Sequence, residues 1–263
     1  MSAPVRIEPS FYHRVWGSPR LEPWFPNRPE ITGEVWFPAG DLLVKFVFTT
    51  DKLSVQVHPD DDYAGRHENS RGKTEMWYIL EATPEARIAA GFRQTRTRNE
   101  VRAAAESGQI EPMLAWWPVR PGDTFFIPAG TVHAIGGGIV LCEIQQNSDI
   151  TYRLYDYGRP RPLHLDNSLD VATLGPHPGP TRPNHEAARS LLAGCRYFTV
   201  ERIQSSATFE ACPAGNGDLL VFLDGAATVG GCRAVRGETW RLPAPATIVP
   251  DGAVRLLHVS VPR

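Results

Sequence analysis

The sequence has few cysteines, no block of one charge and no long apolar run. Its four cysteines are Cys142, Cys195, Cys212 and Cys232. None forms a Cys-x-x-Cys pair, which argues against a thiolate metal site or a disulfide framework. The 27 basic and 29 acidic residues nearly cancel, and no basic block indicates nucleic acid or an anionic membrane as partner.

Two further absences concern membranes and export. No run of about 18 apolar residues would form a membrane-spanning helix. The opening residues, MSAPVRIEPSFYHRVWG, lack the apolar segment of a signal peptide. These absences predict a cytoplasmic protein that does not bind membranes.

Glycine and proline are abundant, and they separate many short apolar runs. The 263 residues include 23 glycines and 24 prolines, a composition that favours strands and turns over helix bundles. We expect a mainly β fold of two jelly-roll barrels packed together, with a few short helices. The predicted division is an N-terminal catalytic barrel over 1–174, a Pro-rich linker and helix over 175–194, and a C-terminal barrel over 195–263.

Helix signals occur in three places. Residues 97–110 are Ala-rich, with Asn99 as the expected N-cap and Gly108 as the stop. Residues 184–194 carry Asn184 and Gly194 in the same roles, and residues 168–174 predict a short third helix. The polar segment 59–72 is expected to be a loop.

A period-two pattern brings polar side chains together on one strand face. In the stretch LSVQVH, Ser54, Gln56 and His58 alternate with apolar residues, so the three polar side chains share a face. After the polar segment, a second strand begins beside Lys73 and Glu75. The pattern predicts that the second strand returns these two groups toward the amide and the imidazole.

A second motif lies in PGDTFFIPAGTVHAIGGG. The spacing of Gly122, Pro128, Gly130 and His133 resembles the second cupin motif, in which turns aim a metal-binding histidine into a barrel. The two histidines, one carboxylate and one amide oxygen of both motifs form a plausible site for a divalent cation. The predicted ligands are Gln56, His58, Glu75 and His133.

Longer segments resemble type I mannose-6-phosphate isomerase, a cupin family. They are LSVQVHPDDDYAGRHE, GKTEMWYIL, GTVHAIGGGIVLCEIQQNSDITYRLYDYGR and ITGEVWF, within roughly residues 10 to 175. The resemblance implies one zinc ion per chain on these same four ligands. It also implies the interconversion of mannose 6-phosphate and fructose 6-phosphate. The segment GEVWFPAGDLLVKF leaves no room for the family's helical insertion, and the C-terminal barrel lacks a His/Glu set, so we expect a short form with one metal-free barrel.

Isomerisation of an aldose to a ketose through a cis-enediol needs an acid–base group. Lys73 lies two residues before Glu75 on the same strand face, and a nearby metal would lower its pKa, so it is the first candidate. The resemblance places Glu143 and Arg153 in the active site, and Glu143 is the second candidate. Lys73 and Glu75 could instead form an ion pair, and Glu143 could orient a metal ligand.

The phosphate group of a sugar phosphate would need cationic or hydroxyl partners. Arg153 suits the phosphate or the enediolate, because a guanidinium binds both bidentately. Ser54 and Arg159 are further candidates for substrate binding. Arg153 could otherwise be a structural ion-pair partner of Asp156.

Two other functions fit the same residues. Two histidines and one carboxylate also occur in cupin iron(II) dioxygenases, although Gln56 and Lys73 argue against open iron positions. A protein that binds sugar phosphates without catalysis would keep the pocket, although retention of Lys73, Glu143 and Arg153 argues against it. The sequence leaves open whether the protein is a monomer or a homodimer.

Overall fold

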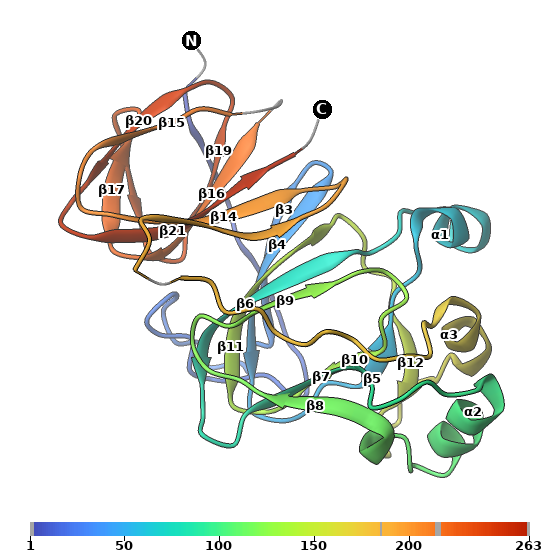
Figure 1. The fold of residues 1–263 in the computed structure, drawn as a ribbon. Helices are drawn as coiled ribbons and strands as arrows, with labels where there is room; N and C mark the ends of the chain where they lie inside the picture. The colour runs from blue at the N-terminus through green and yellow to red at the C-terminus, as the bar shows by residue number, and fades with distance from the viewer. Residues whose placement is uncertain (1–2, 185, 214–216, 262–263) are drawn as a thin grey trace.

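The computed structural model describes residues 3–184, 186–213 and 217–261, and it is mainly β (Figure 1). The described strands form four sheets in which every strand pairing is antiparallel. The predicted mainly β architecture with a few short helices is confirmed. The described strands form open sheets packed in pairs rather than closed barrels.

Two sheets enclose the N-terminal core. The six-stranded sheet runs in the order β2 (Ser10–Tyr12), β3 (Glu34–Ala39), β4 (Leu42–Thr49), β11 (Ile139–Gln146), β6 (Glu75–Ala82) and β9 (Thr124–Ile127). The five-stranded sheet runs in the order β12 (Tyr152–Tyr155), β5 (Val55–Val57), β10 (His133–Ile135), β7 (Arg87–Phe92) and β8 (Leu114–Pro118). Alternate apolar residues of both sheets, such as Leu141 and Ile88, fill the space between them.

The other two sheets form the C-terminal part. The six-stranded sheet runs in the order β1 (Val5–Ile7), β19 (Thr239–Leu242), β16 (Asp218–Asp224), β21 (Val254–Ser260), β14 (Thr199–Ser205) and β13 (Arg189–Gly194). The four-stranded sheet runs in the order β15 (Phe209–Ala211), β20 (Ala246–Pro250), β17 (Ala226–Val229) and β18 (Cys232–Val235). Strand β1 pairs with β19, so it belongs to this sheet although its residues lie in the predicted segment 1–174.

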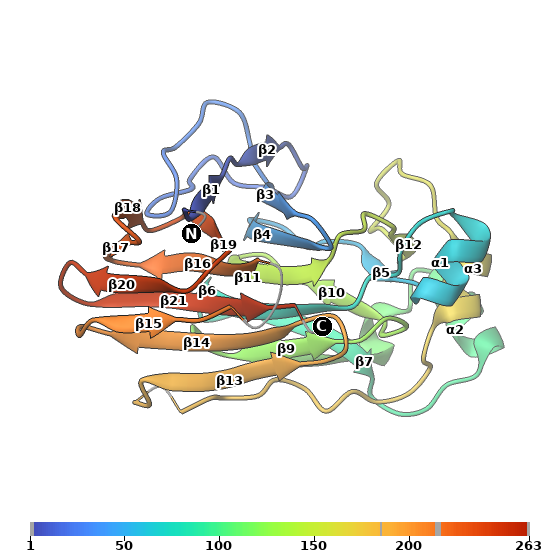
Figure 2. The same cartoon turned by 90° about the horizontal axis from the view of Figure 1, so that it is seen from above.

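The two six-stranded sheets pack against each other and share one apolar core (Figure 2). Phe37, Phe46 and Met76 of the N-terminal sheet contribute to this core together with Phe198 and Leu257 of the C-terminal part. All five side chains are at most 1% exposed. Burial of this shared face holds the two halves together.

The α-helices of the described residues are short and gather near one end of the five-stranded sheet (Figures 1 and 2). They are α1 (Asp61–His67), α2 (Arg98–Glu106) and α3 (Leu165–Val171), and a 3₁₀ turn, η1, spans Glu111–Met113. The loop prediction for 59–72 is wrong, because Asp60 caps α1 by accepting a hydrogen bond from the backbone of Tyr63. None of the described helices is long and apolar enough to span a membrane.

The predicted helix boundaries are displaced by a few residues. Helix α2 starts with a capping box between Thr97 and Glu100, so Thr97 and not Asn99 is the N-cap. The helix ends before Gly108, which has a positive φ of 73°. Helix α3 begins three residues earlier than the segment 168–174 predicts.

The predicted helix over 184–194 is wrong in its described residues; residue 185 lies outside them. The side chain of Asn184 accepts a hydrogen bond from the backbone of Glu186, two residues on, which is a turn rather than a helix cap. Residues Arg189–Gly194 then form strand β13 beside β14. Pairing with the edge of the sheet therefore overrides the helical propensity of the alanines and leucines.

The segment where the family insertion would lie is a hairpin. Strands β3 and β4 pair down to Ala39 and Leu42, so only Gly40 and Asp41 connect them. Gly40 has a φ of 72°, which glycine adopts without strain. The prediction that the chain lacks a helical insertion here is confirmed.

The shared core predicts a strong effect of Phe198→Ala. Phe198 is fully buried between the six-stranded sheets, so its truncation should lower the free energy of unfolding by about 3–5 kcal/mol. Leu191→Ala is the control, because Leu191 is 65% exposed on β13. Urea unfolding measures both, and equal losses in the two variants would contradict a shared core that holds the halves together.

Candidate active site

Neighbouring strands bring the predicted ligands together inside the N-terminal sheets. Gln56 on β5 is directly opposite His133 on β10 and Arg153 on β12, so the three side chains lie in one row. His58 follows β5, and Glu75 begins β6 in the facing sheet. The site therefore lies between the two N-terminal sheets, at the end of β5.

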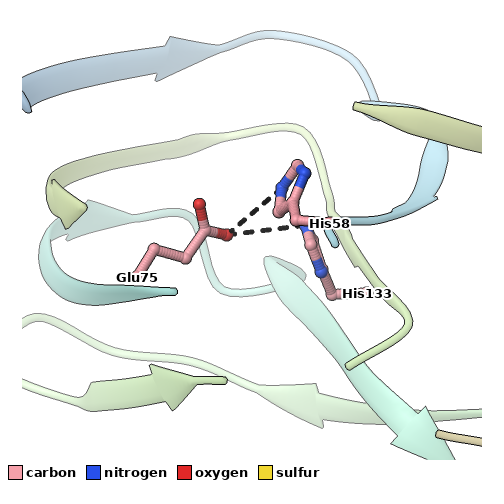
Figure 3. Close-up of side chains that lie close together, drawn as sticks. All are labelled: His58, Glu75 and His133. Carbon is pink, nitrogen blue, oxygen red and sulfur yellow. Dashed lines mark ion pairs between the residues drawn. The ribbon is translucent and has the colours of Figure 1, made fainter. Parts of the chain in front are cut away.

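His58, Glu75 and His133 converge on one point (Figure 3). Glu75 Oε1 lies 3.7 Å from His58 Nε2 and 3.5 Å from His133 Nε2. All three residues are at most 1% exposed. Donors bound at roughly 2.0–2.1 Å to a tetrahedral ion would lie about 3.4 Å apart, so these separations fit a metal site.

Each histidine is oriented by a backbone carbonyl. His58 Nδ1 lies 2.8 Å from the carbonyl oxygen of Ile150, and His133 Nδ1 lies 2.9 Å from that of Thr131. A carbonyl only accepts, so each Nδ1 carries the proton and each Nε2 lone pair faces the site. Burial lowers the pKa of His58 well below its usual value and that of His133 to about 4, so both imidazoles are neutral at neutral pH.

Glu75 is a buried carboxylate with incomplete compensation. Neither oxygen accepts a well-aligned hydrogen bond, although Lys73 Nζ lies 3.0 Å from Oε2. Burial raises the pKa of Glu75 to about 7, against the opposing attraction of Lys73. A buried carboxylate of this kind is stabilised by a further cation, which supports a metal at this point.

Gln56 contacts both His133 and Ser54. The Gln56 amide nitrogen lies 3.2 Å from His133 Nε2, and its oxygen accepts a hydrogen bond from Ser54 Oγ at 3.0 Å. For Gln56 to be a ligand, its amide must turn so that the oxygen faces the site. Ser54 is positioned to control that rotation.

Lys73 lies beside His58 and Glu75. Its Nζ is 3.1 Å from His58 Nε2, and the side chain is buried. Burial alone would lower the pKa of Lys73, but Glu75 and Glu143 outweigh it, so the pKa is raised. The pKa of Lys73 is therefore raised rather than lowered, and the Lys73–Glu75 ion pair considered from the sequence is present.

Lys45 is a buried cation that the sequence analysis missed. It lies on β4 opposite Glu143, and its Nζ is 3.1 Å from Glu143 Oε1. Trp77 Nε1 donates to the other oxygen at 2.9 Å. Burial alone would raise the pKa of Glu143, but Lys45, Lys73 and the Trp77 hydrogen bond hold it at about 2. The sequence signal that could have identified Lys45 is its position as a lone lysine within the apolar run DLLVKFVFTT.

Lys45, Lys73 and Glu143 line a cavity of about 300 Å³, whereas His58, Glu75 and His133 lie behind its wall. Its wall includes the predicted residues Ser54, Gln56, Lys73, Glu143 and Arg153, and also residues not predicted from the sequence: Arg14, Glu34, Lys45, Asp149 and Arg161. Cationic and acidic side chains therefore face the same cavity. Such a cavity suits a small, highly polar anionic ligand.

The arginines are arranged differently from the sequence predictions. Asp156 pairs with Arg159 at 3.3 Å and with Arg161 at 2.5 Å. Among the described residues, no carboxylate lies within ion-pair distance of Arg153, so the proposed Arg153–Asp156 pair is wrong. Arg159 also binds Asp51 at 2.5 Å and is outside the cavity wall, whereas Arg161 belongs to it.

The chain is similar in sequence and in structure to known proteins. No family model matches the chain. The mannose-6-phosphate isomerase of Bacillus subtilis (strain 168) is 37% identical over 246 residues, covering 75% of this chain and 78% of the relative. That of Streptococcus mutans serotype c is 34% identical over 257 residues, covering 78% and 80%. The crystal structure of the mannose 6-phosphate isomerase from Bacillus subtilis matches with a TM-score of 0.88 at 26% identity, covering 98% of this chain and all of that one.

Paired antiparallel sheets that enclose two histidines and a carboxylate define a cupin-type enzyme with a potential metal site. Within this class, the identities of 34–37% over most of the chain are decisive. The chain belongs to the mannose-6-phosphate isomerase family.

The buried histidines predict a pH dependence of stability in the metal-free protein. Between pH 4 and 6.5 the unfolded state protonates His133 while the folded state keeps it neutral, so acid favours unfolding. Glu75 acts in the opposite direction, because its raised pKa makes the folded state bind more protons between about 4.5 and 7.

The free energy of unfolding should therefore fall less steeply toward acid pH in His133→Asn than in the wild type. Urea unfolding at several pH values between 4 and 7 measures the difference. His67→Asn is the control, because His67 is exposed outside the site. Identical slopes for the wild type and His133→Asn would rule out a buried neutral His133.

Proposed function

We propose that this chain interconverts mannose 6-phosphate and fructose 6-phosphate through a cis-enediol, with one zinc ion bound by Gln56, His58, Glu75 and His133. The observation that carries this proposal is the buried His58–Glu75–His133 cluster, which contacts Gln56 and Lys73 in the wall of a charged cavity. The names of the relatives support the same substrates. They are isomerases, so they do not support the iron(II) dioxygenase alternative.

The donor set supports zinc as the ion. Zinc accepts imidazole nitrogen and carboxylate oxygen, and catalytic sites leave a position for substrate or water. A bound zinc ion would supply positive charge and orientation to the sugar oxygens. The carbonyl contacts of His58 and His133 already fix the tautomer that such binding requires.

The reaction moves one proton from C2 to C1 and one from the O2 hydroxyl to O1. Lys73 remains the first candidate for the acid–base group, because its amine lies in the cavity beside His58, although its raised pKa favours the protonated, acidic form. Glu143 is the second candidate, although a pKa of about 2 makes it a weak base at neutral pH. Lys45 and Trp77 hold Glu143 in place as a fixed negative charge.

The phosphate group is best matched by the arginines of the cavity wall. Arg153 has a buried Nε without a hydrogen-bond partner. Its pKa is lowered, mainly by burial and secondly by repulsion from Arg161. An anion between the two guanidiniums would relieve that repulsion. We therefore assign the phosphate to Arg153 and Arg161, with Ser54 as a further donor, and give Arg159 a structural role.

The proposal predicts turnover that depends on zinc. Fructose 6-phosphate formation from mannose 6-phosphate should be lost after chelation and restored by zinc, because His58, Glu75 and His133 need a cation. A coupled assay measures the rate, and metal analysis counts the ions per chain. His133→Ala should lose metal and activity together, whereas the exposed variant His67→Asn should keep both.

Two outcomes would contradict this assignment. Full activity in protein shown to be metal-free would remove the metal role. No turnover with one zinc per chain would leave a protein that binds sugar phosphates without isomerising them.

The two arginines that share Asp156 provide a matched test of phosphate binding. Arg161→Ala should raise KM for mannose 6-phosphate at least tenfold, because Arg161 lines the cavity. Arg159→Ala removes the same type of contact to Asp156 but lies outside the wall, so its KM should change little. Steady-state kinetics of both variants decide the assignment, which fails if Arg159→Ala has the larger effect.

A further inference from the structure

A second polar cavity lies where the two six-stranded sheets meet. It has a volume of about 230 Å³ and lies outside the proposed active site. One side is formed by β6 and the turn before β9, and the other by β14 and β21. The lining residues are Tyr78, Ile79, Leu80, Pro121, Gly122, Arg202, Gln204 and Arg255.

The strand register explains why three polar side chains face this cavity. Arg202 and Gln204 are two apart on β14, so they share a face. Arg255 on β21 is directly opposite Gln204. The same face carries Val200 and Leu257, which belong to the apolar core between the sheets. Two guanidinium groups and an amide thus interrupt an otherwise apolar interface at its rim.

The charges around the cavity are predominantly positive. Among the described residues that line it, none is acidic. Arg255 lies 3.6 Å from the carboxylate of Asp224, which Arg236 also binds. One carboxylate is therefore shared by these two arginines.

One donor of this cavity has no hydrogen-bond partner. It is the buried Nε of Arg255, although the Arg255 side chain as a whole is 40% exposed. Burial raises the pKa of Tyr78, and the positive charges of Arg255 and Arg202 act against that shift. Arg202 is fixed by Nη1, which donates to Gln204 Oε1 at 2.9 Å, and by Nη2, which donates to the carbonyl oxygen of Ala187 at 2.8 Å.

We propose that Arg202, Arg255 and Tyr78 form a binding site for a small tetrahedral oxyanion, inorganic phosphate or sulfate, between the two halves of the chain. Guanidinium groups bind such anions through paired, charge-assisted hydrogen bonds, and a tyrosine hydroxyl donates a further one. The cavity admits one tetrahedral anion with a few waters. Because its walls come from both six-stranded sheets, a bound anion stabilises their packing.

The test compares the thermal stability of variants with and without the anion. Phosphate or sulfate at millimolar concentration should raise Tm above the value in chloride of equal ionic strength, because an anion that binds only the folded state stabilises it. Arg255→Gln should lose most of this anion-dependent shift. Arg153→Gln removes the positive charge proposed to bind phosphate in the active-site cavity, and it should keep the shift in sulfate.

Arg233→Gln is the surface control, because Arg233 forms an exposed ion pair with Asp251. A full anion-dependent shift in Arg255→Gln, or an equal loss in Arg233→Gln, would overturn the proposal. A selenate soak of wild-type crystals gives an answer that does not depend on folding of a variant. Anomalous density between Arg202 and Arg255 supports the site, and density elsewhere alone contradicts it.

Discussion

The site depends on charges that are buried together and must compensate one another. Glu75, Lys73, Glu143 and Lys45 are each at most 5% exposed, and each carboxylate lies close to one lysine. The two pairs are not equivalent. Glu143 is fully satisfied by Lys45 and Trp77, whereas Glu75 keeps oxygens without well-aligned partners and faces two neutral imidazoles. Because of this asymmetry, the charge of Glu75 remains available to a cation, whereas Glu143 is a fixed part of the cavity wall.

The packing of the sheets makes such a buried site possible. The six-stranded sheet that carries Glu75 and Glu143 is covered on its other face by the C-terminal half, through the shared core. Trp77 and Tyr78 are consecutive residues of β6 and face opposite sides of that sheet, one toward the proposed active site and the other toward the second half. The C-terminal half therefore excludes water from the back of the sheet that carries Glu75 and Glu143.

Local patterns in the sequence identified much of the site and less of its surroundings. The period-two pattern of Ser54, Gln56 and His58 and the turn residues before His133 are short-range signals, and the structure brings these side chains together with Glu75. Partners such as Lys45 and Arg161 depend on which strands become neighbours, which no local pattern specifies. The predicted helix over 184–194 failed for the same reason, because the free edge of β14 captured residues with helical propensity.

Strand β1 gives the chain a connectivity that its linear order hides. Val5–Ile7 completes the C-terminal six-stranded sheet beside β19, and the chain then runs through the whole N-terminal half before it returns to the same sheet. The N-terminal half is therefore inserted within the C-terminal one. The strands before and after the insertion, β1 and β13, belong to the same six-stranded sheet. A single cut in the linker would separate β1 from its partner strand β19, so it would not give two self-contained pieces. The two halves could therefore be transferred between proteins only together.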